Sequence, residues 1–378
     1  MYESSSLVLK ELPKERFRKT WALLESGVTA GVAPGMVAGF WSEESPETLY
    51  TATVGQKSVE PNRSPLEALT VFDLASLTKV FSTATLAAQL IQRGWLNWNT
   101  PLAAVFPNYA FPEIEMRHLL SHTAGFAAWA PYWEKLREHF LPAPIHEVSV
   151  SKRQRQARQL IFGAIPEARV GARALYSDIS FMLLGFALEE ITGMDLDHAV
   201  EKFLWQPLGI EEAFYHRIYK SADHEKMDHV AATENSAWRG GILQGQVHDD
   251  NAWAMGGYAG HAGAFASIRD VLHFSRRLLS GFLPPEILRA AWRKVAEPAG
   301  CERTLGWDTV SGENSSAPGF SKNAVGHLGF TGTSLWMEPQ EKIAVALLTN
   351  RVHPSRENNL IKSFRPRFHQ AFRGELGR

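Results

Sequence analysis

The sequence is poor in cysteine, with a single thiol at Cys301 among 378 residues. One cysteine cannot form an intramolecular disulfide, and it cannot supply the several thiolates of a cysteine-rich metal site. A lone thiol is typical of a reducing compartment, although it is also tolerated outside the cell. We therefore expect a protein of the cytoplasm without disulfide bonds.

Long apolar runs are also missing. Spanning a bilayer takes about 20 consecutive apolar residues. The longest candidates, Phe181 to Leu188 and Ile343 to Leu348, have the lengths of a buried helix segment and a buried strand. Within the first 19 residues the only apolar run is Leu7 to Leu9, which is too short for the core of a signal peptide. These features predict a globular, cytoplasmic protein with no membrane partner.

Neither sign of charge is in excess. Lys and Arg number 39 and Asp and Glu number 40, which gives a formal net charge of -1. A dedicated nucleic-acid binder would show a basic excess, so a nucleic-acid partner is not expected. The basic run at 152–158 (KRQRQAR) is predicted to be an exposed helix face. Hydrophobic residues make up 45%, which excludes wholesale disorder, and the 12 tryptophans are typical of cores, clefts and interfaces.

Strand patterns occur at both ends of the chain and helix patterns dominate between them. This order predicts an α/β platform formed by residues 1–80 and 262–378, with a mostly helical subdomain, 81–261, inserted into it and a cleft between the two. The spacing of apolar residues predicts helices over 14–29, 77–93, 179–192 and 358–372, and strands over 36–41, 49–55, 333–337 and 343–349.

The strongest candidate for chemistry is Ser76-Leu77-Thr78-Lys79. At the start of a helix, this spacing places the serine and the lysine one turn apart on the same face. A lysine buried in an apolar helix loses part of its preference for the charged form and can act as a base. The helix N-terminus also supplies N–H groups that can hold an oxyanion. A second copy, Ser149 to Lys152, precedes the charged run, and its lysine is expected to be solvated and inert.

Two later segments strengthen the interpretation of Ser76. They are Ala174-Leu175-Tyr176-Ser177-Asp178 and Val325-Gly326-His327-Leu328-Gly329-Phe330-Thr331-Gly332-Thr333. In this order and spacing, the three motifs resemble those of the serine β-lactamase and DD-peptidase superfamily. The similarity is greatest to the class C β-lactamase-like branch, with its esterases and D-amino-acid peptidases. It extends over about residues 15–370, including the runs RHLLSHTAGF, YSDISFMLLG and HLGFTGTSLW.

The resemblance implies a fold and a set of site residues. The fold is a mainly antiparallel sheet flanked by N- and C-terminal helices, with an inserted helical subdomain. Ser76 matches the acylated nucleophile, Lys79 its base and Tyr176 the proton shuttle. The backbone N–H groups of Ser76 and Phe330 match the oxyanion hole. The substrate-binding set comprises Asp178, His327 and Gly329, and neither a cofactor nor a metal is implied.

Two positions depart from the family pattern. Where β-lactamases commonly carry Tyr-x-Asn, this chain has Asp178, whose ionised side chain can only accept hydrogen bonds. Asp178 would suit a donor on the substrate, pair with Lys79, or cap the following helix. His327 replaces the lysine of Lys-Thr-Gly and is mostly neutral at pH 7 unless a neighbour such as Asp178 raises its pKa. Loss of the fixed cation disfavours efficient turnover of anionic β-lactams.

A further polar cluster contains His248, Asp249, Asp250 and His261. These residues are able to bind a divalent metal, but their spacing matches no compact ligand motif. We expect them to form a wall of the cleft. Other plausible cleft walls are Trp129, Trp133, Trp238 and Trp253.

Taken together, these patterns predict a serine hydrolase that forms an acyl-enzyme on Ser76. Its expected partners are small ester, amide or peptide substrates, with esterase or peptidase activity favoured over efficient β-lactamase activity. The alternatives are a β-lactamase or penicillin-binding protein with weak turnover, a non-catalytic peptide sensor of the same fold, and a metallohydrolase centred on His248 and His261. The sequence leaves the natural substrate and the oligomeric state open.

Overall fold

A computed structural model describes residues 7–218, 227–311 and 316–377. Part of the segment on which the expected lack of a signal peptide rests, residues 1–6, lies outside these ranges. Within them, no helix combines the length and the apolar character needed to cross a membrane. The cytoplasmic location stays a prediction.

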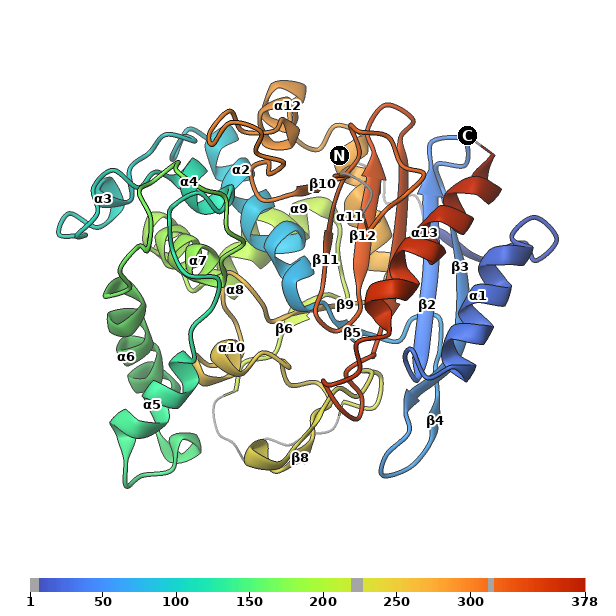
Figure 1. The fold of residues 1–378 in the computed structure, drawn as a ribbon, viewed down its shortest axis with the longest axis horizontal. Helices are drawn as coiled ribbons and strands as arrows, with labels where there is room; N and C mark the ends of the chain where they lie inside the picture. Colours follow the sequence, from blue (N-terminus) through green and yellow to red (C-terminus); the bar gives the residue numbers. More distant parts are fainter. Residues whose placement is uncertain (1–6, 219–226, 312–315, 378) are drawn as a thin grey trace.

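The largest element is an eight-stranded sheet in which the two ends of the chain meet (Figure 1). Its strands follow the order β1-β3-β2-β13-β12-β11-β10, and β4 pairs with β3 off this path. Only β1 runs parallel to its neighbour, so the sheet is mainly antiparallel, as predicted. The strands are β1 (Val8–Glu11), β2 (Gly35–Ser42), β3 (Thr48–Ser58), β4 (Ser64–Pro65), β10 (Asp308–Thr309), β11 (Val325–Leu328), β12 (Ser334–Glu338) and β13 (Ile343–Thr349).

The centre of this sheet is formed by β2 and β13, which are buried along their whole lengths. Their continuous apolar runs suit strands that are covered on both faces. The two pair antiparallel, with Leu347 opposite Ala38 and Ile343 opposite Ser42. This pairing joins residues about 300 positions apart and brings the two ends of the chain into one sheet.

Helices cover both faces of the sheet. On one face, α1 (Arg18–Thr29) and α13 (Ile361–Leu376) lie side by side and pack on it through one apolar cluster (Figure 1). On the other face, α11 (Ile268–Leu279) packs against β2 and β13. A capping box between Ser267 and Asp270 starts α11, because each side chain satisfies a backbone N–H of the other residue.

The remaining helices gather beside the sheet, to the left in Figure 1. Their core is continuous with the side chains of the α11-covered face, including Val37 and Trp41. They are α2 (Thr85–Gln92), α3 (Leu102–Val105), α4 (Met116–Leu120), α5 (Tyr132–Phe140), α6 (Val150–Phe162), α7 (Asp178–Thr192), α8 (Leu196–Val200), α9 (Gln206–Leu208), α10 (Asp250–Ala254) and α12 (Pro285–Trp292). Short strands β5 (Phe72–Asp73), β6 (Phe214–Tyr215) and β9 (Ala264–Ala266) form a second sheet, and β7 (Asn235–Ser236) pairs with β8 (Gly241–Ile242).

All the elements predicted from apolar spacing are present, with shifts of a few residues at their ends. The run 152–158 lies in α6, so the predicted helix is present. The predicted exposure is wrong for Arg153 and Ala157, which are buried because Arg153 turns inward and donates to the carbonyls of Ile218 and Trp253. The helix predicted over 77–93 is more varied: a 3-10 turn (Ala75–Leu77) and a π-helical segment (Lys79–Ala84) precede α2. The division into a platform and an inserted subdomain stays a prediction.

Candidate active site

Ser76 is placed by the second, three-stranded sheet. Strand β5 pairs with β9, and the chain turns sharply after it at Ala75, whose φ is 46°. A positive φ is strained for a residue with a side chain and marks positions that the surroundings hold firmly. The Asp73 carboxylate holds this turn, because it accepts hydrogen bonds from the N–H groups of Ala75 (2.8 Å) and His248 (2.6 Å). Ser76 therefore stands on a rigid support.

Lys79 lies fully buried at the start of the π-helical segment. Such segments are rare and occur frequently at functional sites. The Nζ atom donates to three acceptors: Ser76 Oγ at 3.0 Å, Asp178 Oδ1 at 2.7 Å and the His261 carbonyl at 3.2 Å. These three contacts use all three N–H groups of an ammonium.

The charge of Lys79 follows from these contacts. Burial by itself lowers the pKa of Lys79, but the Asp178 carboxylate and the Tyr176 hydroxyl outweigh it, so the pKa is raised above its usual value. The resting side chain is therefore an ammonium paired with Asp178, and only its minor amine form can accept a proton. The sequence left this pairing open as one of three roles for Asp178.

Tyr176 lies on the segment before α7, beside Lys79. The Lys79 Nζ atom is 4.8 Å from the centre of the Tyr176 ring. Burial raises the pKa of the Tyr176 phenol, and the nearby positive charge of Lys79, which acts in the opposite direction, does not outweigh it. Its hydroxyl is therefore neutral at pH 7 and can pass a proton between the side chains of Lys79 and Ser76.

Phe330 occupies the turn between β11 and β12, and two threonines attach this turn to the backbone before Ser76. Thr331 Oγ1 donates to the Asp73 carbonyl at 2.7 Å, and Thr333 Oγ1 donates to the Leu74 carbonyl at 3.0 Å. At Gly329 an added Cβ would lie 2.0 Å from Thr333 Oγ1, so only glycine allows this approach. The backbone N–H groups of Ser76 and Phe330 are thus carried by two segments that are bonded to each other.

Two arginines hold the same turn from behind. Arg365, on α13, donates to the carbonyls of Gly332 (Nε, 3.1 Å) and Gly329 (Nη2). Arg351 donates from Nε to the Phe330 carbonyl at 2.6 Å, and its guanidinium lies 4.2 Å from the centre of the Phe330 ring. Neither residue was assigned to the site from the sequence. The run VALLTNRVHP, which contains Arg351 and resembles the family, was an available signal for that residue, whereas no motif contains Arg365.

A cavity of about 350 Å³ opens in front of Ser76. Trp129 and Phe330 line it, and both are about half exposed (48% and 51%). The other lining residues are Ala75, Ser76, Tyr176, Asp178, His248, Asp249, Asp250, His261, Ala262 and Arg356. The cavity therefore combines an apolar rim with a polar floor that contains the serine.

His327 lies behind Tyr176, with ring centres 5.8 Å apart, and is 2% exposed. Its Nδ1 donates to the Leu328 carbonyl at 2.8 Å. Burial, together with the nearby Lys79 ammonium, lowers the pKa of His327 to about 3. From the sequence, we considered that Asp178 raises the pKa of His327. That idea is wrong, because Asp178 pairs with Lys79 instead. His327 is neutral, and its contact with substrate stays a prediction.

The polar loop around His248 lines the cavity, as expected for a cleft wall. Its imidazoles pair with separate carboxylates: His261 Nε2 donates to Asp249 at 2.9 Å, and His248 Nε2 lies 3.1 Å from Glu234. These side chains do not converge on one point. In the described part of the chain, a cluster whose side chains lie close enough to bind a metal occurs elsewhere, at Asp195, Asp197 and His198. There Arg217 already donates hydrogen bonds to both carboxylates.

The proposed helix cap at Asp178 is wrong by one position. Ser177 is the N-cap of α7, and its Oγ accepts from the Ser180 N–H at 3.3 Å. Asp178 is the first helical residue, so its side chain is free to turn toward Lys79. Of the four tryptophans expected at the cleft, Trp129 lines the cavity, while Trp133, Trp238 and Trp253 pack on one another.

Two further residues beside Tyr176 were not predicted. The His122 ring lies 4.6 Å from the Tyr176 ring, and its Nδ1 accepts from the Ser177 N–H at 3.0 Å. The run RHLLSHTAGF, which contains His122, was the available signal. The Arg303 guanidinium lies 5.4 Å from the Tyr176 ring centre and pairs with Asp308. Nothing in the sequence around Arg303 indicates this position.

This arrangement can carry out acyl transfer. It contains a hydroxyl nucleophile, an amine that can accept the hydroxyl proton, a neutral phenol beside both, and two rigidly held N–H groups. Each part is a side chain or backbone group of the protein itself.

Comparison with known proteins relates the whole arrangement to one family. The family described as Beta-lactamase matches residues 22–363. A putative D-alanyl-D-alanine carboxypeptidase of Escherichia coli (strain K12) is 29% identical over 329 residues, which cover 78% of this chain and 73% of that protein.

Two solved structures share the fold. One is EstCE1, a hydrolase with promiscuous acyltransferase activity, with a TM-score of 0.70 and 20% identity over 94% of this chain and 99% of its own. The other is simvastatin synthase (LovD) from Aspergillus terreus, with a TM-score of 0.72 and 17% identity over 96% of this chain and 99% of its own. At these identities the likeness establishes the fold class.

Proposed function

Because the chain belongs to the Beta-lactamase family, we propose that it is a serine hydrolase that cleaves small esters or amides through an acyl-enzyme on Ser76. The observation that carries this proposal is the hydrogen bond of 3.0 Å between Lys79 Nζ and Ser76 Oγ, at the floor of an open cavity. A serine becomes nucleophilic when an adjacent base can take its proton.

Acylation starts from the amine form of Lys79. As Ser76 Oγ bonds to the substrate carbonyl carbon, its proton moves to Lys79 Nζ. The carbonyl oxygen becomes an oxyanion, held by the N–H groups of Ser76 and Phe330. When the tetrahedral intermediate collapses, the bond to the leaving group breaks. The leaving group takes a proton from the Lys79 ammonium through the Tyr176 hydroxyl.

Deacylation repeats these steps with water. The water oxygen attacks the acyl carbon while its proton passes to Lys79 through Tyr176, and collapse returns a proton to Ser76 Oγ. The acid product then leaves. Asp178 keeps Lys79 in place at 2.7 Å but makes the amine form scarce at neutral pH.

Neutral esters and amides suit the cavity better than anionic β-lactams do. The neutral, buried His327 supplies no positive charge where β-lactamases carry a lysine. The half-exposed rings of Trp129 and Phe330 offer apolar contact to an acyl or leaving group. A β-lactamase or penicillin-binding protein with weak turnover, or a peptide sensor of this fold, is the alternative.

The test is hydrolysis of p-nitrophenyl butyrate by the intact chain and two serine variants. Ser76→Ala should reduce kcat by at least about 10³-fold, because it removes the nucleophile. Ser149→Ala, in the second Ser-x-x-Lys copy, is the matched control and should keep full activity. Retained activity in Ser76→Ala would refute the proposal. A stable acyl adduct on Ser76 without release would favour the sensor or the penicillin-binding protein.

A second candidate activity is carboxypeptidase cleavage before a C-terminal D-amino acid. The observation that favours it is Arg303, whose guanidinium lies 5.4 Å from the centre of the Tyr176 ring. In place of the missing lysine it would bind a substrate carboxylate by exchanging its present partner, Asp308. The E. coli relative is named as a putative enzyme of this kind.

Peptides ending in D-Ala-D-Ala, as the free acid and as the amide, test this candidate. Arg303→Gln should raise KM for the free acid by about tenfold, the effect of losing one charge-assisted hydrogen bond, and leave the amide unchanged. Equal effects on both peptides, or no cleavage of either, would refute it.

A further inference from the structure

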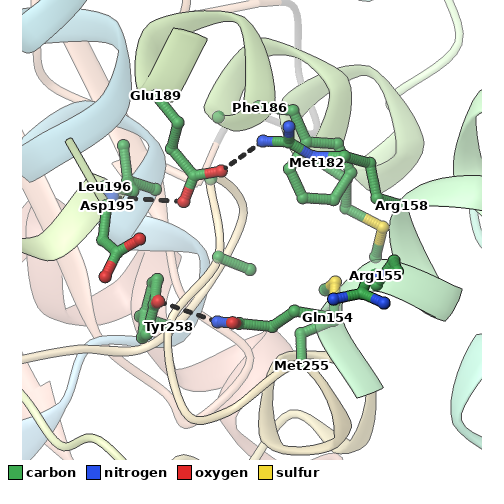
Figure 2. A pocket seen from close by; sticks show the side chains of 13 residues that line it. Gln154, Arg155, Arg158, Met182, Phe186, Glu189, Asp195, Leu196, Met255 and Tyr258 are labelled. Carbon is green, nitrogen blue, oxygen red and sulfur yellow. Dashed lines mark hydrogen bonds and ion pairs between the residues drawn. The ribbon is translucent and has the colours of Figure 1, made fainter. Parts of the chain in front are cut away.

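A second cavity lies on the far side of the segment that contacts Lys79. It has a volume of about 310 Å³ and is bounded by α6, α7, the start of α8 and the segment 255–260 after α10 (Figure 2). Ligand pockets have volumes of about 300–1,000 Å³, so this one suits a small molecule. Its volume corresponds to about ten water molecules at their share of the liquid.

Much of the lining is apolar. Met182 and Phe186 come from α7, Leu196 from α8, and Met255 from the segment after α10. Methionine side chains are polarisable and flexible, and they adapt to ligands of different shapes. Figure 2 shows these side chains around the open centre of the cavity. A hydrocarbon chain or an aromatic ring would bury apolar area there.

Most polar groups of the lining are already paired within the protein. Arg158 donates to Glu189 at 2.8 Å, and Gln154 donates to the Tyr258 hydroxyl at 2.7 Å, so two bridges frame the cavity (Figure 2). The remaining acidic lining residue, Asp195, is bonded by Arg217 at 2.9 Å. Each carboxylate of the lining therefore has a guanidinium partner, and Arg217 bonds Asp197 as well.

Arg155 is the exception. It is exposed at the pocket edge on α6, and among residues 7–218, 227–311 and 316–377 no carboxylate forms an ion pair with it. A guanidinium binds carboxylates through two parallel hydrogen bonds. The pocket thus offers one uncompensated cation beside an apolar interior.

We propose that this pocket is a second ligand site, for monocarboxylates with a medium-length aliphatic or aromatic body. The carboxylate pairs with Arg155, and the apolar body lies against Met182, Phe186 and Met255. The site is separate from the cavity at Ser76, so the binding itself does not depend on the proposed function.

Occupancy of this pocket can reach Lys79 through one shared wall. Ala259 and Gly260 line the pocket, and the next residue, His261, accepts the Lys79 hydrogen bond at 3.2 Å through its carbonyl. Gly260 packs tightly on α7, because an added Cβ would lie 2.0 Å from the Phe181 carbonyl. Its own carbonyl accepts from Thr83 at 2.7 Å. A ligand that displaces this rigid segment therefore displaces an acceptor of Lys79.

Binding is tested by isothermal titration calorimetry of octanoate into Ser76→Ala protein, which cannot turn over an ester. Charge reversal at the pocket, Arg155→Glu, should weaken octanoate binding by at least tenfold. Lys152→Glu is the matched control, because Lys152 is another exposed residue of α6 that does not line the pocket. This variant carries the same change of charge and should bind octanoate normally. Octylamine, with the opposite charge, should bind at least tenfold more weakly than octanoate.

Three binding results would overturn the site: no octanoate binding to the parent protein, equal weakening in Arg155→Glu and Lys152→Glu, or octylamine binding as tightly as octanoate. The effect on Lys79 rests on the proposed function and is measured as ester turnover by proteins with Ser76 intact. Saturating octanoate should change kcat at least twofold in Lys152→Glu but not in Arg155→Glu. An unchanged kcat despite binding would overturn the coupling alone, and absent turnover would refute the proposed function instead.

Discussion

Replacing Asp178 by asparagine removes the negative charge beside Lys79 while keeping an oxygen acceptor in the same place. In the native protein burial lowers the pKa of Lys79, but the 2.7 Å contact with Asp178, aided by Tyr176, outweighs burial and raises it. Without that charge, burial dominates and favours the neutral amine. We therefore expect Asp178→Asn to supply the catalytic base at lower pH.

The size of the effect follows from the contact. At 2.7 Å, two unit charges attract by about 6 kcal/mol at an effective dielectric constant of about 20. This is a ceiling, because the Asp178 side chain is 17% exposed and solvent screens part of it. Pairs at this range commonly shift a pKa by about one to three units, at about 1.4 kcal/mol each. The acid limb of kcat/KM should move to lower pH by a similar amount.

The assay is the pH profile of kcat/KM for p-nitrophenyl butyrate between pH 5 and 10. Acid limbs of kcat/KM report groups of the free enzyme. The native enzyme should gain activity over this whole range, as the amine form of Lys79 accumulates. The kcat/KM of Asp178→Asn should reach its plateau at a lower pH. The plateau itself should be a few-fold lower, because an amine of lower pKa is a weaker base.

Asp250→Asn is the control, since Asp250 lines the same cavity but pairs with Arg356 at 3.1 Å. It should leave the acid limb in place. The reasoning is refuted if Asp178→Asn lowers kcat/KM equally at every pH without moving the limb. That result would mean that Asp178 itself transfers a proton and that its charge does not govern Lys79.

Three further changes test the surroundings of the site. Arg365→Met removes the Arg365 donor from the buried Gly332 carbonyl and one of two donors from the Gly329 carbonyl, which keeps the Gly332 N–H. The change should lower kcat, and it should lower the free energy of unfolding in urea by about 1–3 kcal/mol; exposed Arg367→Met should do neither. His327 has a pKa of about 3 in the folded protein and about 6.5 in the unfolded chain. Between these two pH values only the unfolded chain binds the proton, so His327 lowers the free energy of unfolding by about 1.4 kcal/mol for each unit by which the pH is lowered. His327→Asn should remove this share of the slope and leave the share of His369, whose pKa burial also lowers to about 3; an unchanged slope would contradict the buried neutral state of His327. Phe330→Ala keeps the backbone N–H and should change kcat for a small ester less than about threefold; a loss above a hundredfold would show that the ring is needed.

Local pattern predicted the secondary structure well. Apolar spacing identified α1, α7, α13 and the central strands β2 and β13, because the period of the apolar residues within each segment matches the face that the element buries. It did not predict the short strands β5 and β9, of two and three residues, which set the position of Ser76. Such short strands carry no period of their own and exist only through pairing between segments nearly 200 residues apart.

The motif residues were recognisable, but their partners were not. Ser76 and Lys79 stand one turn apart in any helix, so their contact needed no tertiary information. Arg303, Arg351 and Arg365 were missed because each reaches the site from a different part of the chain. An arginine has no sequence signature for the carbonyl or ring that it will contact.

The residue order alone was enough for the family resemblance, for the mainly antiparallel fold that it implies, and for the proposal of a serine beside a lysine as the reacting pair, because these depend on residue types at fixed spacing. Only the tertiary structure decided the electrostatics. It paired Asp178 with Lys79, left His327 buried and neutral, and separated the histidines of the polar loop. Charge states depend on burial and on distances of a few ångströms between segments far apart in the chain, and spacing along the sequence contains neither.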